Sequence, residues 1–411
     1  MKRSRRFPIL SQALFLLLLA GQVCYAGWDF TAPADPNRYW GVSSTVAGMY
    51  DDNFFSSTRD QQSGLRFSSD LKLRANVPLD RLFVGLQYDY GILYPHDVDL
   101  GGVDQTHNVT VSANYIVSPR LELNLNENYI SSLQAGLVQG LNGTSVSISN
   151  AGDYIYDAVG ASVNYVLAPR WTVAVIGNWD IWRYQSSAIA SNNDHEDYTA
   201  TLSGVYALDS RTQVGLNYQY GQNIFVNPGT NNALNAQSHT VFVSVVRRFN
   251  PRLSLTLNGG YTVRESEDGS RSTSPSGMGS LVYNYGPLST VTLTIAQSLS
   301  EASVGVTRSF SAQENTSIEL QVNHQLTSRL KVIIDASYVY SAFTAALAGS
   351  TAGQVSPSEQ SISDRLSLNY AFREWLSAVL NYTRTELLSS DQRIIAPFER
   401  NQISLGLTLT Y

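Results

Sequence analysis

Apolar and polar residues alternate along most of this chain with a period of two. One face of the segment 253–263 carries Leu253, Leu255, Leu257, Gly259, Tyr261 and Val263, and the other face carries Ser, Thr, Asn and Gly. The same alternation returns at 65–77, 109–115, 159–165, 214–220, 330–340 and 403–411. Such a pattern predicts β-strands with two unlike faces.

The length of these runs indicates which kind of β-protein the chain forms. Alternating runs of about 10–13 residues exceed the usual globular strand of about 5–6 residues. They fit tilted strands that cross about 25 Å of hydrocarbon. The pattern therefore favours an all-β fold, a transmembrane antiparallel up-and-down β-barrel.

A short segment recurs between the runs and predicts tight turns. Residues 115–121 read YIVSPRL and residues 165–171 read YVLAPRW, with echoes at 206–211 and 248–253. Looser copies lie at 77–82, 285–288, 326–330 and 370–375. A spacing of about 40 residues marks a repeated hairpin, whereas a propeller of similar period needs four short strands in each repeat.

These turns allow the strands to be counted. We expect one strand over 39–50, then hairpins that turn near residues 79, 119, 169, 209, 251, 287, 328 and 373, and a last strand over 401–411. The total is roughly 18, an even number as in bacterial barrels. A count of 16 is the alternative, because residues 300–313, beside the hairpin at 287, alternate poorly.

The connections opposite the tight turns are longer and polar. They cover 51–63, 94–105, 133–154, 184–196, 224–237, 265–275, 300–313, 342–360 and 388–400. Short periplasmic turns and longer outer loops are the expected asymmetry of such barrels. In the longest loop, 133–154, the only charge is Asp153, so we expect this loop to fold inward and narrow the pore at little desolvation cost.

Aromatic residues gather at both ends of the predicted strands. Beside the short turns lie Trp40, Tyr115, Tyr165, Trp171, Tyr206, Phe249, Tyr285 and Trp375. Beside the long loops lie Tyr50, Tyr88, Tyr90, Tyr129, Trp179, Tyr218, Tyr220, Tyr261, Tyr338 and Tyr382. These two girdles suit the two lipid–water boundaries.

The N-terminus predicts export. Lys2, Arg3, Arg5 and Arg6 precede an apolar run over 13–20, and small residues follow at the spacing of a cleavage site. We expect a signal peptide over 1–26, a periplasmic segment over 27–38 that is too short for a plug domain, and the barrel over 39–411. The only cysteine, Cys24, lies in the signal, so disulfides do not build the fold.

Composition narrows the possible functions. Only 15% of residues are charged, below the globular norm of about 25%. Mean hydropathy is −0.13, too low for a helical membrane protein. Loss of the four basic signal residues lowers the net charge from −6 to −10. That acidic balance argues against nucleic acid as a partner.

A hexapeptide at the end of the first predicted strand connects the chain with a known family. Residues 50–55 read YDDNFF, which resembles the Tyr-Asp-Asp-Asn-Ile/Val-Phe signature of the putative β-barrel porin-2 family. That family also includes exopolysaccharide-operon outer-membrane proteins. The resemblance implies an outer-membrane barrel. The last strand, ending at Tyr411, looks like the signal read by the barrel-assembly machinery.

Charges within the alternating runs are candidates for the pore lining. If Leu71 and Leu73 face lipid, their neighbours face inward, because a lipid-facing charge at the midplane costs about 2–4 kcal/mol. The pore-lining candidates are Asp70, Lys72, Arg74, Asp89, Glu122, Asp180, Glu319, Lys331, Asp335 and Arg365. Some of them are expected to pair across the wall, and a subset sets ion and solute preference.

No catalytic, cofactor or metal site stands out. His96, His107, His195, His239 and His324 are scattered, and none lies in a hydrolase motif. Residues 194–197 read DHED, an acidic cluster whose oxygen ligands could bind a divalent cation. A solvated loop tip is favoured instead, because the spacing of ligands in known cation-binding loops is missing. Asp51-Asp52-Asn53 is interpreted as a strand cap that satisfies loop backbone groups.

The sequence therefore predicts a non-enzymatic protein of the bacterial outer membrane. The leading hypothesis is a porin-like channel for passive diffusion of small hydrophilic solutes. The alternatives are the outer-membrane component of polysaccharide export, and a non-conducting structural or receptor barrel. The expected partners are outer-membrane lipid, the solutes or polysaccharide, and the assembly machinery.

Overall fold

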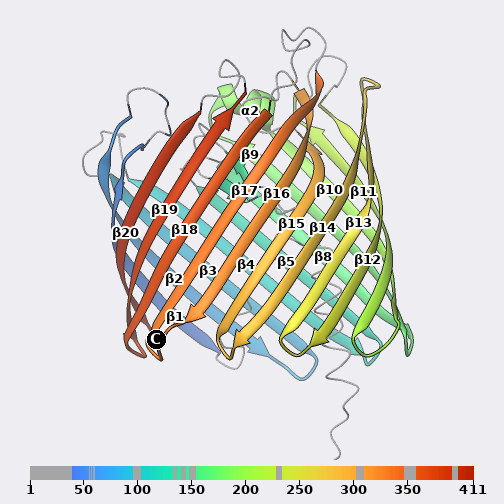
Figure 1. Ribbon diagram of the computed structural model, residues 1–411, viewed down its shortest axis with the longest axis horizontal. Helices are drawn as coiled ribbons and strands as arrows, with labels where there is room; N and C mark the ends of the chain where they lie inside the picture. Colours follow the sequence, from blue (N-terminus) through green and yellow to red (C-terminus); the bar gives the residue numbers. More distant parts are fainter. Residues whose placement is uncertain are drawn as a thin grey trace, which may run out of the picture.

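The computed structural model describes residues 39–54, 56, 58, 61–95, 103–132, 137–139, 145–147, 154–227, 234–301, 310–346, 358–390 and 397–411. The predicted signal peptide over 1–26 and the segment over 27–38 lie outside these residues. Eighteen strands of the described chain form one sheet that closes into a barrel (Figure 1). The predicted fold is confirmed, and 18 rather than 16 is the strand count.

The strands follow the alternating runs. They are β1 (Trp40–Asp51), β2 (Gly64–Pro78), β3 (Leu82–Pro95), β4 (Asp104–Ser118), β5 (Leu121–Ser132), β8 (Tyr154–Ala168), β9 (Trp171–Tyr184), β10 (His195–Ala207), β11 (Thr212–Phe225), β12 (Ala236–Asn250), β13 (Leu253–Ser266), β14 (Arg271–Gly286), β15 (Ser289–Glu301), β16 (Phe310–Gln325), β17 (Leu330–Ala346), β18 (Ser358–Arg373), β19 (Leu376–Ser389) and β20 (Phe398–Thr410). Two short strands, β6 (Leu137–Gln139) and β7 (Ser145–Ser147), pair separately.

Each barrel strand pairs antiparallel with its neighbours in the chain, and the ends of the sheet meet. β1 pairs with β2 on one side and with β20 on the other, from Ser43 opposite Thr410 to Asp51 opposite Gln402. The hairpin near residue 287 is present as β14 and β15. Closure matters physically because it leaves no sheet edge to lose its hydrogen bonds in lipid.

The recurring turn segment has a local cause. In several copies the residue two positions before the arginine accepts the arginine's backbone N–H through its side chain. Ser118 accepts from Arg120 at 3.2 Å, Asp209 from Arg211 at 2.6 Å and Asn250 from Arg252 at 2.8 Å. Such side-chain turns reverse the chain in a few residues. They explain why the motif tolerates Ser, Asp or Asn at that place.

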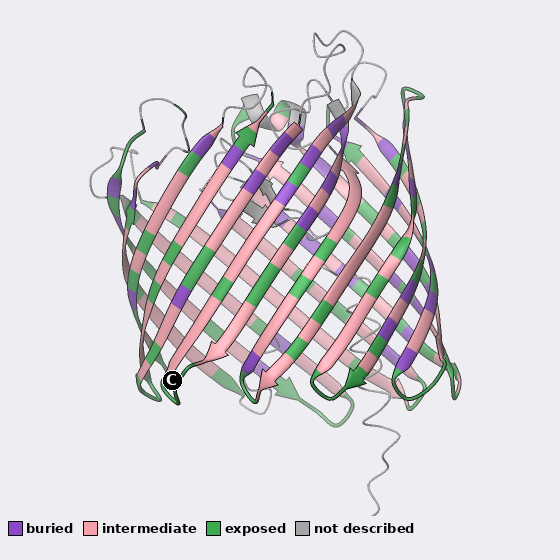
Figure 2. Cartoon of the chain, in the orientation of Figure 1, coloured by how far each residue is buried: buried purple, intermediate pink, exposed green. Residues whose placement is uncertain are grey.

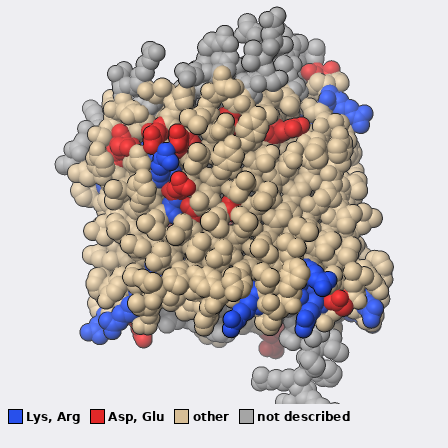
Figure 3. All heavy atoms as spheres, viewed as in Figure 1, with Lys and Arg blue, Asp and Glu red and all other residues tan. Residues whose placement is uncertain are grey.

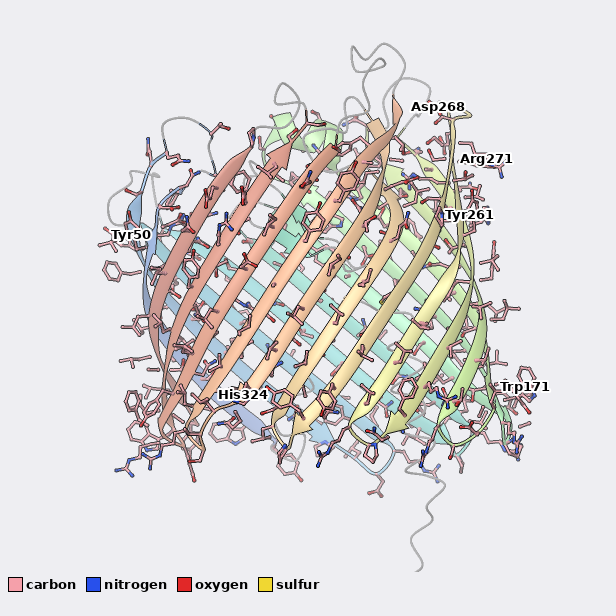
Figure 4. The ribbon with its side chains drawn as sticks, in the orientation of Figure 1. Tyr50, Trp171, Tyr261, Asp268, Arg271 and His324 are labelled. Atoms are coloured by element: carbon pink, nitrogen blue, oxygen red, sulfur yellow. The ribbon has the colours of Figure 1, made fainter. Side chains whose placement is uncertain are left out.

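Alternation separates an apolar outer wall from a polar inner wall. Leu65, Phe67 and Leu73 are exposed on the outside of β2, whereas Arg66 is buried on the inside. Aromatic side chains ring the wall at two levels: Trp171 lies near the turn end, and Tyr50 and Tyr261 lie near the loop end (Figure 4). Buried positions gather mainly toward the loop end of the strands (Figure 2). The outer wall therefore suits a hydrocarbon layer between two interfaces.

One predicted outer loop is wrong. The segment 265–275 was expected to be a loop, but β13 continues to Ser266 and β14 begins at Arg271. The turn between them contains Gly269 at φ +86°, a conformation that glycine adopts without strain. Strand pairing thus extends beyond the girdle at this hairpin, where Asp268 and Arg271 are labelled in Figure 4.

A short helix, α2 (Ser187–Asn193), connects β9 to β10. Within the described ranges, no helix is both long and apolar enough to span a bilayer.

Candidate functional site: the lumen of the barrel

Strand alternation places all ten pore-lining candidates on the inner wall. Asp70, Lys72 and Arg74 share β2, Asp89 lies on β3, Glu122 on β5, Asp180 on β9, Glu319 on β16, Lys331 and Asp335 on β17, and Arg365 on β18. Their neighbours on the same strands, such as Leu73, Leu366 and Ile334, are exposed on the outer face. Whether these charges set selectivity stays a prediction.

The structure brings together the candidates on β2 and β3. Lys72 lies opposite Asp89, and Lys72 Nζ is 3.5 Å from Asp89 Oδ2. Arg74 Nε donates to Gln87 Oε1 at 3.1 Å, and Gln87 Nε2 donates to Asp89 Oδ2 at 2.8 Å. The Lys72 side chain is 44% exposed, so this cluster presents charge to the water of the lumen.

A second cluster joins β17 to β18. Arg365 donates to Asp335 Oδ2 through Nε at 2.9 Å and through Nη2 at 2.5 Å. Gln321 also donates to Asp335, at 3.1 Å. The Arg365 side chain is 55% exposed, so the pair is solvated and its net contribution to stability is small.

Two further acidic candidates, Glu122 and Asp180, lie apart from these two clusters. Glu122 is buried beside Asn114, which donates to it. Asp180 is also buried and accepts from the Tyr156 hydroxyl at 3.4 Å. The exposed salt bridges among the candidates therefore lie on β2–β3 and on β17–β18, whereas these two buried acids lie on β5 and β9.

Between the charges, neutral side chains link neighbouring strands across the inner wall. The hydrogen-bonded pairs are Thr45–Thr408, Asn114–Asn124, Asn124–Ser162, Asn178–Thr199, Ser203–Asn217, Asn217–Ser244, Thr240–Thr262, Ser280–Thr294, Ser367–Asn381 and Asn381–Ser404. Amides and hydroxyls both donate and accept. This neutral band lines the inner wall with hydrogen-bonding groups that carry no net charge.

The hexapeptide closes the seam of the barrel. Asp51, on β1, has a fully buried side chain. Its Oδ2 lies 2.8 Å from Arg66 Nη2 on β2 and 2.6 Å from Arg400 Nη2 on β20, and it accepts from Gln402 at 2.9 Å. One carboxylate therefore ties the first, second and last strands at the loop end.

Other residues of the hexapeptide support this seam. The guanidinium of Arg66 lies 3.4 Å from the centre of the Phe54 ring, a cation–π contact. Asn53 donates to the backbone oxygen of Glu399 at 2.8 Å, and Asp52 accepts from Asn401 N at 2.6 Å. The expectation that this segment satisfies loop backbone groups is confirmed. Arg66 and Arg400 were missed, because their contact with Asp51 depends on the register of neighbouring strands and, for Arg400, on closure of the barrel.

The predicted loop tip at 194–197 is wrong. β10 begins at His195, so alternation sends His195 and Asp197 inward and Glu196 outward. His195 is buried, and its Nε2 is 3.4 Å from Asp197 Oδ2. Glu196 instead pairs with Arg183 on the outer face. Across the ranges that the structure covers, no group of three His, Cys, Asp or Glu residues is arranged to hold a metal ion.

Sequence reasoning also missed a buried aromatic cluster on the inner wall. Tyr156 and Trp182 have ring centres 4.4 Å apart, and His195 and Phe225 lie 4.9 Å apart. Tyr154 and Tyr184 join the cluster. Alternation along the strands could have predicted this cluster, because its residues occupy inward-facing positions, opposite to those of the outer aromatics Trp179 and Tyr198.

Some polar side chains face outward. Three histidines make the same contact: His107, His239 and His324 each place Nδ1 within 2.8–2.9 Å of a tyrosine hydroxyl, on Tyr88, Tyr218 and Tyr285. Glu127 lies among apolar neighbours, opposite Val111 and Val159. Arg384 pairs with Glu386 and Glu399, a charged patch visible on the wall in Figure 3.

Part of the chain matches a known protein family. Residues 248–411 match the family "Putative beta-barrel porin 2". The resemblance drawn from the hexapeptide is thereby confirmed on a different stretch, from the end of β12 to β20. The family match and the closed barrel are those of an outer-membrane β-barrel. The chain lies in the bacterial outer membrane.

Solved structures from two bacteria are also similar to this chain. The outer membrane protein opdK from Pseudomonas aeruginosa is 15% identical, with a TM-score of 0.48, covering 90% of this chain and 99% of that one. Pseudomonas aeruginosa OpdL is 13% identical, with a TM-score of 0.47 over 90% and 98%. Acinetobacter baumannii OccAB4 is 11% identical, with a TM-score of 0.44 over 91% and 99%. No curated protein matches the sequence.

Proposed function

We propose that this barrel is a porin-like channel for passive diffusion of small hydrophilic solutes. The observation that carries the proposal is a closed barrel of 18 strands with a polar inner wall. Barrels of about 16–18 strands enclose an aqueous channel. An apolar outer wall and a solvated inner wall are the arrangement that such a channel needs.

The inner wall supports a preference for neutral or zwitterionic solutes over simple ions. Its exposed cations, Lys72 and Arg365, each lie beside a carboxylate, so their fields are partly cancelled. The neutral band supplies hydrogen bonds between the charged clusters. A solute with hydroxyl groups, or with both signs of charge, finds partners along this wall.

The neutral band also favours a second candidate, the export of polysaccharide. A hydroxyl-rich chain exchanges hydrogen bonds readily with Asn, Ser and Thr side chains such as those that join β10, β11 and β12. Such a path lets a polymer slide without strong binding at one position.

Conductance in planar bilayers tests the proposal. The refolded chain is expected to give stable single-channel steps, and liposomes that contain it should swell in small sugars. A folded barrel that gives neither current nor swelling would overturn the channel and favour the structural or receptor barrel.

A size series separates the two candidates. Swelling rates that fall steadily from monosaccharides to trisaccharides support passive diffusion of small solutes. Long oligosaccharides that block the current reversibly, with no passage of small sugars, would favour export.

A further inference from the structure

Arginines occupy the same place in successive periplasmic turns. Arg81, Arg120, Arg170, Arg211 and Arg252 lie in the turns of the five consecutive hairpins from β2 to β13, and all five are exposed. We call this set the arginine arc. Arg329 repeats the placement between β16 and β17. The recurrence gives more than half of the barrel rim a regular row of guanidinium groups.

The backbone holds these turns in a fixed spacing. The carbonyl oxygen of each arc arginine accepts from an amide of the next hairpin, at 2.7–2.9 Å. Examples are Ile116 N to Arg81 O and Val166 N to Arg120 O, both at 2.8 Å. Successive arginines are therefore two strands apart, or about 10 Å across the sheet.

Aromatic residues place the arc at the membrane boundary. Trp171 follows Arg170 directly, is 47% exposed, and packs against Tyr206 with ring centres 4.8 Å apart. Arg211 Nη1 lies 3.5 Å from the backbone oxygen of Phe249, another girdle residue. Because Trp and Tyr favour the interface, these guanidinium groups lie at the level of lipid headgroups.

Two acids lie in these turns, Asp80 beside Arg81 and Asp209 near Arg211, so five arginines face two carboxylates and the arc keeps an excess of positive charge. The backbone N–H of Arg211 donates to Asp209, which lowers the pKa of that carboxyl, so Asp209 stays ionised and offsets part of the charge of Arg211. On the face shown in Figure 3, Lys and Arg side chains gather along the turn edge of the wall, and most acidic side chains lie toward the loop end. On that face the two ends of the barrel therefore differ in charge.

We propose that the arginine arc binds the phosphates of anionic phospholipids of the phosphatidylglycerol type in the periplasmic leaflet. A guanidinium donates two parallel hydrogen bonds to phosphate oxygens. A net negative headgroup is favoured over a zwitterionic one, since the arc has no matching row of acids to hold a choline or ethanolamine.

Fluorescence quenching by brominated lipids tests the proposal, because Trp171 lies beside Arg170. In the intact chain, a minor fraction of brominated phosphatidylglycerol in vesicles of unbrominated phosphatidylcholine should quench tryptophan emission more strongly than the same fraction of brominated phosphatidylcholine. That excess should disappear in the variant Arg120→Gln, Arg170→Gln, Arg211→Gln, Arg252→Gln. It should persist in the control Arg271→Gln, at the opposite end of the barrel.

Equal quenching by the two lipids in the intact chain would overturn the proposal, and so would an excess that survives in the four-site variant. If that variant does not fold, Arg170→Gln alone and a salt titration of the intact chain serve instead. High salt should remove the excess by screening. A four-site variant that changes ion selectivity but keeps its lipid preference would assign the arc to permeating anions and overturn lipid binding.

Discussion

At the scale of single residues, position on the inner or outer face decides what a charge does. Asp51 and Glu127 are both carboxylates within strands, but Asp51 is enclosed between two arginines and Glu127 faces outward among valines. One stabilises the closed seam, and the other opposes the apolar character of the wall. Substitutions at the two sites are therefore expected to have opposite effects.

Asp51→Asn should destabilise the barrel strongly. The change removes the negative charge between Arg66 and Arg400 and leaves two cations without their counter-charge, which costs about 3–5 kcal/mol for a buried pair. The temperature at which the folded form is lost on gels should fall. Asp52→Asn is the control, since Asp52 contacts Asn401 rather than the buried arginines. An unchanged transition temperature for Asp51→Asn would contradict the seam role.

Glu127→Leu should stabilise the barrel. A lipid-facing carboxylate destabilises a barrel by roughly 1 kcal/mol or more. This cost is smaller than that of a lipid-facing Lys or Arg at the midplane. Urea unfolding in lipid vesicles measures the gain. Glu122→Leu on the same strand is the matched control and should be destabilising, because Asn114 loses an acceptor on the inner wall. A loss of stability in Glu127→Leu would show that this wall does not face hydrocarbon.

At the scale of elements, the charged side chains that one strand presents to the lumen act together. On β2, Lys72 and Arg74 lie two residues apart and share their face with Asp70. Across the pairing with β3 they meet Asp89 and Gln87. The net charge of this part of the inner wall therefore depends on all the charged residues of the strand rather than on one residue.

Replacing Lys72 and Arg74 by Gln should shift the reversal potential toward cations. The change leaves Asp70 and Asp89 without their neighbouring positive charges, so the wall of this arc becomes acidic. Bilayer recordings under a salt gradient measure the shift. Arg271→Gln, on the outer face at the loop end of β14, should leave it unchanged. A shift toward anions would mean that the pair does not control the lumen field.

The loop over 133–154 is the element whose role stays a prediction. It lies outside the described residues except for the paired segments β6 and β7 and for Tyr154, which begins β8. Deletion of residues 136–150 is expected to raise conductance, since the loop's sparse charge makes an inward position inexpensive in desolvation. Equal conductance from a folded deletion variant would show that another part of the wall limits the current.

At the scale of the whole molecule, closure of the barrel makes the eighteen amphipathic strands unfold together. Every described barrel strand is paired on both sides, including β1 with β20. No strand can leave without breaking two ladders at once. This arrangement makes detergent unfolding slow, because backbone groups in an apolar medium have no other partner.

The folded chain should therefore migrate differently on gels before and after boiling. An unheated sample keeps its compact barrel and should run apart from the boiled sample. Identical mobility of the two samples, with a folded protein confirmed by circular dichroism, would contradict a closed and detergent-resistant barrel.

The sequence by itself determined the barrel, its girdles and the inward parity of the ten lumen candidates, and it favoured 18 strands while leaving 16 open until the structure decided. All of these depend on the period of two within a strand and on the spacing of the turn segment, which are local properties of the chain. The extent of the β13–β14 hairpin was mispredicted, because polar residues beyond the girdle resemble a loop although they pair as strands.

Only the tertiary structure decided which side chains meet. Asp51 and Arg400 are brought together by closure of the sheet, and no local pattern encodes that contact. The pairing of Lys72 with Asp89, and of Asp335 with Arg365, depends on the register of neighbouring strands. A shift of one residue in register would reverse the face that each side chain occupies, so these contacts follow from the assembled sheet.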